Sequence, residues 1–217
     1  MSSISFDERV GLMVDAEWRA RDNAQTARLL KEAKLPCTAA CLEDIDYDPT
    51  RNLERSVIAQ LSDMLWISEH RNVFITGPSG VGKTWVASAF GNAACRLGKK
   101  VATYRMSRLL EKLSAARIDR TWGKLLASLK KPDLLILDDF GLDILDAVHC
   151  RDLLEIVEDR YGVGSILITA QLPVVQWHGV FEDSTVADAT LDRLVHNSVR
   201  IELRGRSKRG AAAADNP

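Results

Sequence analysis

Residues 77–84 of this chain read Gly-Pro-Ser-Gly-Val-Gly-Lys-Thr, and this stretch decides the fold. It matches the pattern G-x-x-x-x-G-K-[ST] at each required position, after the apolar run 73–76 and before an apolar segment that starts near Trp85. Glycines allow successive backbone N–H groups to point inwards at phosphate oxygens, and the N-terminus of a following helix adds partial positive charge. The stretch therefore predicts a phosphate-binding loop that joins a strand to a helix.

The residues of this loop have separate expected roles at a bound nucleoside triphosphate. Lys83 would neutralise the β- and γ-phosphates, and Thr84 would offer its hydroxyl oxygen to Mg²⁺. A chance glycine-rich turn is the alternative, and both the preceding strand and the acidic motif described next argue against it. The predicted nucleotide-binding residues are Gly77, Pro78, Ser79, Gly80, Val81, Gly82, Lys83 and Thr84.

A second motif consists of four apolar residues followed by two acids, at positions 134–139. Such a run predicts a buried strand that ends in paired carboxylates, which is the acidic partner of a phosphate-binding loop. Asp138 is expected to hold Mg²⁺ through its water shell, and Asp139 to orient or deprotonate the water that attacks the γ-phosphate. Two solvated acids at a strand end are the alternative, and the loop upstream makes the catalytic interpretation the better one.

Two further residues are weaker candidates. Gln171 follows the apolar run 166–169, so it lies at the carboxyl edge of the predicted sheet, where it would sense the γ-phosphate or fix the attacking water. A turn residue before Pro173 explains its position equally well. Arg193, in a predicted helix, is a candidate to reach the phosphate of a neighbouring subunit, although a solvated surface arginine is the default from position alone.

The rest of the chain alternates apolar runs with amphipathic stretches, which predicts a parallel sheet covered by helices on both faces. Before it, Ser5 and Glu8 form a capping-box pattern that starts a helix running towards Leu30, and a second helical pattern runs from Leu53 to Leu65. We predict an N-terminal helical domain over 1–70, a core over 71–205, and a basic and then flexible tail over 206–217. The predicted strands are 73–76, 101–104, 134–137, 166–169 and 199–203.

Composition excludes several classes of protein. The chain has 217 residues, of which 46% are hydrophobic and 27% charged, so it is not a disordered, collagen-like or disulfide-scaffold chain. No apolar run is long enough to span a membrane, and the first residues lack a secretory profile, so we expect a cytoplasmic protein without a membrane partner. The four cysteines lack the spacing of a zinc site and are expected to be free thiols.

The formal net charge of −1 hides a strong segregation of charge along the sequence. Residues 96–131 contain eleven basic and two acidic residues, whereas residues 133–159 contain nine acidic residues and one basic one. The basic stretch is suited to bind a polyanion, with an affinity that falls steeply as salt rises. The alternative is that the basic stretch lies against the acidic one in the fold or on another subunit.

With these motifs in place, the chain resembles the ATP-binding helper proteins of bacterial insertion sequences, the IstB family of AAA+ ATPases, which are related to DnaC-type helicase loaders. The resemblance covers about two hundred residues, and EDRYG and DRLVHN are its more specific motifs. It is carried by FDERVGLMVDAEWRARDN at 6–23, GPSGVGKTW at 77–85, GNAACRLG at 91–98, LLILDDFGL at 134–142, RDLLEIVEDRYG at 151–162, ITAQLP at 168–173 and DATLDRLVHNSVRIEL at 188–203.

The resemblance implies an α/β P-loop core of three layers, with a five-stranded parallel sheet in the order 5-1-4-3-2, after a small helical domain. It implies an ATPase that uses ATP and Mg²⁺, assembles as a homo-oligomer on duplex DNA and assists a cognate transposase in target capture. Hydrolysis is expected to be slow and regulated by DNA and by oligomerisation. By correspondence, Arg193 becomes the arginine finger and Gln171 the sensor, beside Lys83 and Asp139. The expected DNA-binding residues are Arg105, Arg108, Lys112, Arg117, Arg120 and Lys124.

The chain also departs from the family pattern. Its N-terminal domain is expected to lack a first helical segment, no lid is expected after Leu203, and Asp139 stands where many AAA+ proteins have Glu. A helicase loader is the nearest alternative function. A small-molecule P-loop kinase and a DNA-binding scaffold that holds ATP without hydrolysing it are two further ones.

Overall fold

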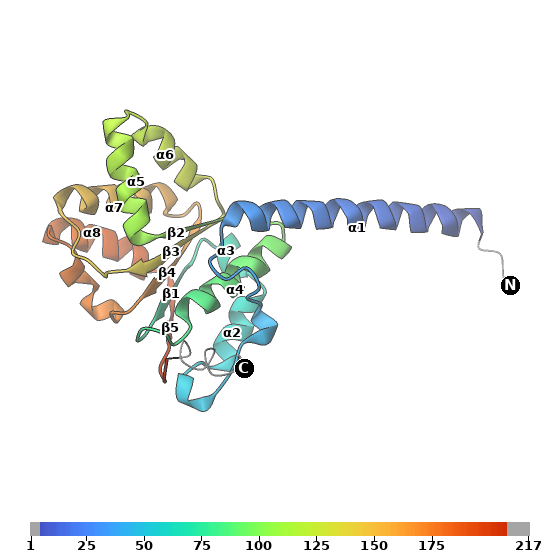
Figure 1. Cartoon of the computed structure of the whole chain (residues 1–217), viewed down its shortest axis with the longest axis horizontal. Coiled ribbons are helices and arrows are strands. Elements are labelled where there is room, and N and C mark those ends of the chain that lie inside the picture. The colour runs from blue at the N-terminus through green and yellow to red at the C-terminus, as the bar shows by residue number, and fades with distance from the viewer. Residues whose placement is uncertain (1–4, 208–217) are drawn as a thin grey trace, which may run out of the picture.

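Five parallel strands form the centre of the computed structural model, which describes residues 5–207 (Figure 1). The order across the sheet is β2-β3-β4-β1-β5, which is 5-1-4-3-2 when it is read from the β5 edge. The predicted parallel α/β sheet is therefore confirmed. The strands are β1 (Asn72–Thr76), β2 (Val101–Arg105), β3 (Leu134–Phe140), β4 (Ser165–Ala170) and β5 (Ser198–Glu202).

Helices cover both faces of the sheet, and the three inner strands β1, β3 and β4 are buried on both sides. Val73 and Ile75 of β1 face α2, α3 and α4, whereas Phe74 between them faces α5, α7 and α8. The α-helices are α1 (Phe6–Ala33), α2 (Arg55–Ser62), α3 (Leu65–Ser68), α4 (Lys83–Arg96), α5 (Met106–Ile118), α6 (Trp122–Lys130), α7 (Ala147–Arg160) and α8 (Ser184–Val195), and the 3₁₀ helices are η1 (Leu42–Asp44), η2 (Pro49–Arg51) and η3 (Val174–Val180).

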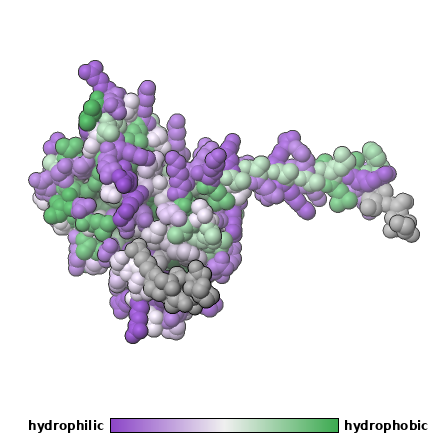
Figure 2. All heavy atoms as spheres, viewed as in Figure 1, coloured by the Kyte–Doolittle hydropathy of each residue, from purple (hydrophilic) through white to green (hydrophobic). Residues whose placement is uncertain are grey.

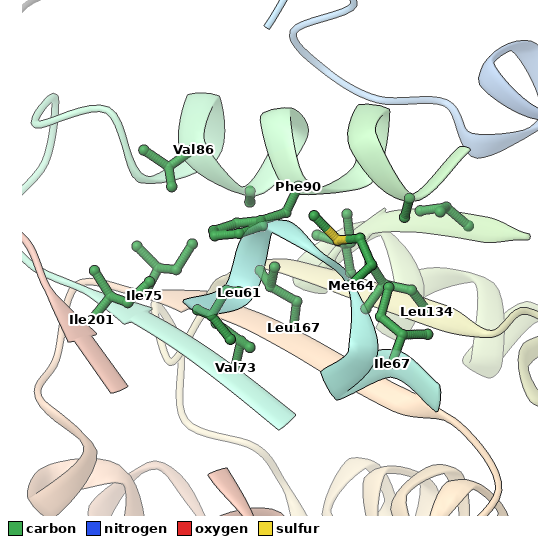
Figure 3. Packing of buried hydrophobic residues seen from close by; sticks show 14 of the residues in the cluster. Leu61, Met64, Ile67, Val73, Ile75, Val86, Phe90, Leu134, Leu167 and Ile201 are labelled. Atoms are coloured by element: carbon green, nitrogen blue, oxygen red, sulfur yellow. The ribbon is translucent and has the colours of Figure 1, made fainter. Parts of the chain in front are cut away.

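The core on one face is built around Phe90 of α4, which lies over the sheet (Figure 3). Its ring meets the ring of Trp66 edge to face, at 6.3 Å between centroids. The pattern that predicts one helix over 53–65 yields two in the structure, because Met64 adopts a left-handed conformation with φ 58° and points into this core. Helices α2 and α3 thus share one hydrophobic core with the sheet, and the domain boundaries at residues 70 and 205 remain predictions.

Helix α1 extends away from the rest of the chain (Figure 1). The predicted capping box is confirmed, since the Ser5 hydroxyl accepts from the backbone N–H of Glu8, and the Glu8 carboxylate accepts from that of Ser5. Leu29 and Ala33 at the other end are buried in the core. The apolar residues of the protruding half are exposed (Figure 2), namely Phe6, Val10, Leu12, Met13, Val14 and Trp18.

The four cysteines are free thiols, as expected, and burial raises the pKa of Cys95 to about 11. Within residues 5–207 no helix is both long enough and apolar enough to cross a membrane. The predicted tail lies almost entirely outside the described residues.

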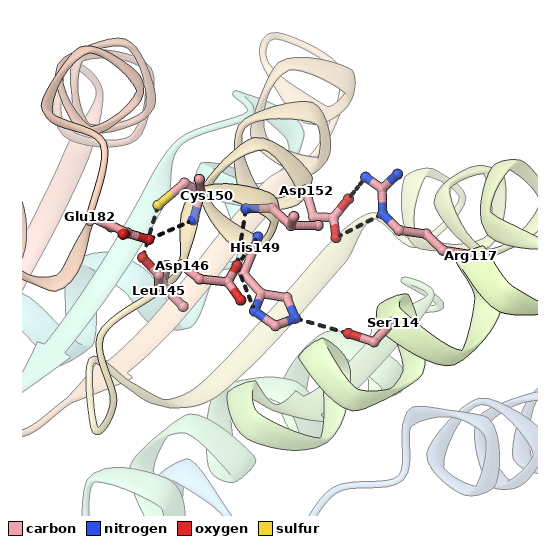
Figure 4. A network of polar contacts seen from close by, with 10 residues as sticks. Ser114, Arg117, Leu145, Asp146, His149, Cys150, Asp152 and Glu182 are labelled. Atoms are coloured by element: carbon pink, nitrogen blue, oxygen red, sulfur yellow. Dashed lines mark hydrogen bonds and ion pairs between the residues drawn. The ribbon is translucent and has the colours of Figure 1, made fainter.

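Helices α5 and α7 are joined by a polar network (Figure 4). His149 contacts the Ser114 hydroxyl through Nε2 at 3.0 Å and the Asp146 carboxylate through Nδ1 at 3.1 Å. Backbone N–H groups at the start of α7, first that of His149, hold the pKa of Asp146 below its ordinary value. One turn further along, the fully buried carboxylate of Asp152 pairs with Arg117. The network fixes the basic helix α5 against the acidic helix α7.

The C-terminal end of α7 is anchored by Arg160, which is only 1% exposed. Its guanidinium donates to the backbone carbonyls of Leu129, Pro132, Asp133 and Ser165 at 2.7 to 3.2 Å, and it forms a longer bond of 3.4 Å to a fifth carbonyl. Burial lowers the pKa of Arg160 to about 10, so the group stays charged at neutral pH. Arg160 therefore holds together the amino ends of β3 and β4 and the end of α6.

We expect Arg160→Met to lower the free energy of unfolding by about 3 kcal/mol or more, because several buried carbonyls lose their donor. Urea unfolding followed by circular dichroism measures the change. Arg151→Met, at an exposed position of the same helix, is the matched control and should unfold like the wild type. Equal unfolding midpoints for the two variants would show that Arg160 is not an anchor.

Candidate functional site

The loop between β1 and α4 has the backbone geometry of a phosphate cradle. Gly80 and Gly82 have φ of 83° and 96°, a left-handed conformation that favours glycine. Gly77 is required for a different reason, since a Cβ there would lie 2.1 Å from the carbonyl oxygen of Leu203. Helix α4 begins at Lys83, so its first N–H groups open towards the loop. The fold therefore positions an anion site at the carboxyl edge of the sheet.

The side chain of Lys83 lies along this loop. Its Nζ donates to the carbonyl oxygens of Gly77 and Pro78, each at 2.8 Å, and the residue is buried. The ammonium group is thus held at the loop on which the phosphates of a ligand would lie, as the motif predicts for it.

The carboxylate of Asp138 is the centre of the site. It is 6% exposed and lies at the carboxyl end of β3. The Thr84 hydroxyl donates to it at 2.9 Å, and the Thr169 hydroxyl donates to its Oδ1 at 2.6 Å. A buried carboxylate needs such partners, because an unpaired charge is costly to bury. The structure thus brings the two predicted magnesium ligands, Thr84 and Asp138, into direct contact.

Thr169 is a site residue that the sequence argument missed. It follows the apolar residues of β4 and lies two residues before Gln171, which the sequence predicts to be the polar contribution of this strand. Thr169 is fully buried and also accepts a hydrogen bond from the backbone N–H of Asp139 at 3.0 Å. Gln171 lies just beyond β4 with an exposed side chain. Both residues stand at the strand end that the sequence identified, and only Thr169 joins the Asp138 cluster.

Asp139, the predicted catalytic carboxylate, has a strained backbone and a basic partner. Its φ is 61°, in the left-handed region that a non-glycine residue rarely adopts. Its Oδ2 lies 3.1 Å from Nε of Arg105, the last residue of β2. Parallel pairing of β2 with β3 sets Arg105 beside Asp138, so the arginine at the end of one strand reaches the carboxylate that follows in the next. Arg105, expected to contact DNA, therefore pairs with the carboxylate that the sequence predicts to be catalytic.

The other predicted DNA-binding residues lie on or beside α5 and α6 and differ in their partners. Arg117 pairs with Asp152, and its guanidinium stacks over Trp122 at 4.7 Å. Arg108 pairs with Glu111 on its own helix at 2.8 Å. Lys112 lies over the ring of Tyr104 at 5.0 Å, and Arg120 and Lys124 are exposed.

The basic and acidic stretches meet in part. Within the described chain, three ion pairs join residues 96–131 to residues 133–159, through Arg105, Arg117 and Lys130. Lys130 contacts Asp159 at 3.1 Å. Most of the basic stretch is thus not neutralised directly by the acidic one.

Arg193 lies far from the loop of its own chain. It is near the end of α8, and the following carbonyl, that of Leu194, accepts from the side chain of Asn72 at 3.0 Å. Asn72 is the first residue of β1, and the phosphate loop begins after Thr76, the last residue of this strand. At about 3.3 Å per residue, the two ends of β1 are about 13 Å apart. Arg193 therefore lies at the amino end of β1, away from the loop that follows the carboxyl end of this strand.

The donor set at Asp138 fits Mg²⁺. This cation takes oxygen ligands, binds through one or two carboxylates, and fills its other positions with phosphate oxygens and water. Thr84 and Asp138 offer a hydroxyl and a carboxylate at the mouth of the phosphate loop. No cluster of three His, Cys, Asp or Glu side chains that would hold a metal elsewhere occurs among residues 5–207.

A cavity of about 260 Å³ adjoins the other side of the loop. Arg51 at its wall donates from Nη2 to the carbonyl oxygen of Val81 at 3.0 Å, so the segment before β1 is fastened to the loop. The cavity is lined by Asp44, Asp46, Arg51, Gly82 and Trp85.

The chain is similar to ATP-binding proteins of insertion sequences. The family model described as IstB-like ATP binding protein matches residues 1–214. A protein of Sinorhizobium fredii named as an insertion sequence ATP-binding protein is 46% identical over 206 residues, which cover 95% of this chain and 84% of the relative. The protein named as the ATP-binding protein of insertion sequence IS1162 from Pseudomonas fluorescens is 47% identical over 171 residues, or 79% of this chain and 74% of its own length.

Among solved structures, the DnaC helicase loader has a similar fold. It aligns with a TM-score of 0.62 at 18% identity, over 76% of this chain and 97% of the other. At this identity the likeness concerns the fold alone.

We expect Thr169→Val to lower the rate of ATP hydrolysis at least about tenfold, because a hydrogen bond to a charged group contributes about 1.5 to 3 kcal/mol. Steady-state phosphate release measures the rate, and equilibrium binding of a fluorescent ATP analogue shows whether the nucleotide still binds. Thr169→Ser keeps the hydroxyl and should retain most of the activity. If the valine variant hydrolyses ATP like the serine variant, the hydroxyl has no part in the site.

Proposed function

This chain belongs to the family of IstB-like ATP-binding proteins, and we propose that it is an ATPase that assembles on duplex DNA and assists a transposase in target capture. The observation that carries the enzymatic part is the cluster in which Thr84, Asp138 and Thr169 meet at the end of the phosphate loop. The insertion-sequence names of its relatives support the role in transposition.

In this proposal the loop and the Asp138 cluster bind the nucleotide. The N–H groups of the loop and the ammonium group of Lys83 hold the phosphates. To do so, Lys83 gives up its hydrogen bonds to the carbonyl oxygens of Gly77 and Pro78 and donates to phosphate oxygens instead. Thr84 and Asp138 would hold Mg²⁺, which would supply positive charge against the phosphates. Asp139 orients the attacking water and accepts its proton. The cavity beside Gly82, which has Trp85 in its wall, accommodates the adenine base of ATP.

The pair of Arg105 and Asp139 supports regulation of hydrolysis by DNA. While the guanidinium lies 3.1 Å from Oδ2 of Asp139, it occupies a carboxylate oxygen that would otherwise hold the attacking water. Arg105 is more than half exposed and is followed directly by the basic helix α5, so a DNA phosphate would compete for it. DNA binding would then release Asp139 for catalysis.

The DNA contacts are assigned to the exposed basic residues of α5, of α6 and of the turn between these helices. Arg108, Lys112, Arg120 and Lys124 are exposed or partly exposed there. Arg117 instead has a structural role, because it pairs with the fully buried carboxylate of Asp152. Phosphate contacts of this kind position a protein on a duplex without reading its sequence.

The assembly is a homo-oligomer in which Arg193 of one subunit completes the nucleotide site of the next. The position of Arg193 supports this, because it lies near the amino ends of the strands, whereas the phosphate loop of its own chain lies at their carboxyl ends. A helicase loader is the second candidate, favoured by the similarity in fold to the DnaC helicase loader. Preference for duplex or single-stranded DNA separates the two functions.

Light scattering of the protein with duplex DNA tests the proposal, with no nucleotide, with ADP and with a slowly hydrolysed ATP analogue. Large assemblies on duplex DNA are expected only with the analogue, because the γ-phosphate is needed to join subunits. Lys83→Ala should abolish them. A monomer under all three conditions, or assembly of Lys83→Ala like that of the wild type, would exclude the proposal, and a preference for single strands would favour the loader.

Arg105→Gln should raise the rate of ATP hydrolysis without DNA by up to about fivefold, since an exposed ion pair contributes up to about 1 kcal/mol. The stimulation by duplex DNA should fall by a similar factor, as measured by phosphate release at low salt. Arg108→Gln, three residues on, removes a base that does not contact Asp139 and should leave the DNA-free rate unchanged. A lower DNA-free rate for Arg105→Gln would mean that this arginine assists the carboxylate.

A further inference from the structure

The two most specific motifs of the sequence, EDRYG at 158–162 and DRLVHN at 192–197, meet in the structure. Oε1 of Glu158 on α7 lies 2.9 Å from Nη2 of Arg193 on α8. Neither the phosphate loop nor the Asp138 cluster involves Glu158, so its position against the proposed arginine finger needs a separate explanation.

Glu158 stands on a fixed part of the fold. Two residues later, Arg160 is buried and bonded to backbone carbonyls from three segments, which immobilises the end of α7. The carboxylate of Glu158 projects from this end towards α8 and is itself partly exposed. A flexible side chain that bonds to it is therefore held relative to the sheet.

Arg193 is held at two points of its guanidinium. Besides the contact of Nη2 with Glu158, its Nη1 donates to the carbonyl oxygen of Ala189 one turn back, at 2.8 Å. A guanidinium has five N–H donors in a rigid plane, so these two contacts leave donors free. The side chain is 33% exposed, which leaves part of it open to a ligand outside the chain.

A cavity of about 340 Å³ lies beside Arg193, at the amino ends of β1, β4 and β5. Its wall combines charged and amide side chains with apolar ones such as Val157 and Ile166. Among its lining residues are Glu69, His70, Asn72, Arg193, His196 and Asn197.

We propose that Glu158 is a positioning residue, which orients Arg193 before a second copy of the chain presents its γ-phosphate. The inference rests on the proposed function, in which Arg193 completes the site of the neighbouring subunit. Ordering a free arginine side chain costs conformational entropy, and Glu158 and Ala189 supply that ordering before the phosphate arrives. Glu158 does not touch the nucleotide and acts only through Arg193.

Steady-state hydrolysis at saturating duplex DNA and saturating protein tests this. Glu158→Ala should lower kcat about tenfold, because a misplaced finger loses much of its stabilisation of the transition state. The ATP concentration at half-maximal rate should stay within about twofold of the wild type, since Glu158 lies far from the phosphate loop of its own chain. Glu158→Gln keeps an acceptor oxygen towards Arg193 and should recover part of the lost rate.

Two comparisons separate positioning from a general structural effect. Glu155→Ala removes an exposed glutamate one turn earlier on α7 and should leave kcat unchanged. Glu158→Ala combined with Arg193→Ala should be no slower than Arg193→Ala alone, because the two residues act through one guanidinium.

The outcomes distinguish this inference from the proposal on which it rests. If Arg193→Ala hydrolyses ATP and assembles normally, the arginine finger is wrong and the role of Glu158 falls with it. If Arg193→Ala is impaired while Glu158→Ala matches or exceeds the wild-type kcat, the finger stands and the positioning role is overturned. Additive losses in the double variant would also overturn it.

Discussion

The buried carboxylate of Asp138 is the interaction on which the rest of the site depends. It lies at the end of β3 and can be buried only because hydroxyl groups from two other elements donate to it, Thr84 on α4 and Thr169 on β4. One charge thus fixes how the phosphate loop sits against the two central strands. Because the Thr169 hydroxyl also accepts from the backbone N–H of Asp139, the same cluster holds Asp139 in its left-handed conformation.

Local patterns of the sequence predict much of the fold. Apolar runs predict all five strands, and the loop motif predicts the start of α4, since both depend on residues that are neighbours along the chain. Thr169 shows where such reasoning ends. The sequence places polar residues at the end of β4 but does not say which side chain turns towards β3, a choice set by the register between the two strands.

Charge illustrates the same limit on a larger scale. The sequence shows that the charges are segregated into a basic and an acidic stretch. It does not show which acidic residue pairs with each basic residue. Arg105 meets Asp139 because β2 and β3 pair in parallel, and Arg117 meets Asp152 because α5 packs against α7. Both pairs depend on contacts between elements that are distant in sequence. Arg105, Arg117 and Lys130 are accordingly engaged by the acidic stretch, and the other basic residues of 96–131 form no ion pair with residues 133–159 in the described part of the chain.

The close approach of Gly77 to the Leu203 carbonyl has a mechanical consequence. The backbone N–H of Leu203 also donates to Thr76 at 2.7 Å, so the phosphate loop and the end of β5 are locked together. At its other end β5 is joined to α8, which carries Arg193. Strand β5 is therefore a rigid link within one chain, which couples the position of the phosphate loop to that of the helix that carries Arg193.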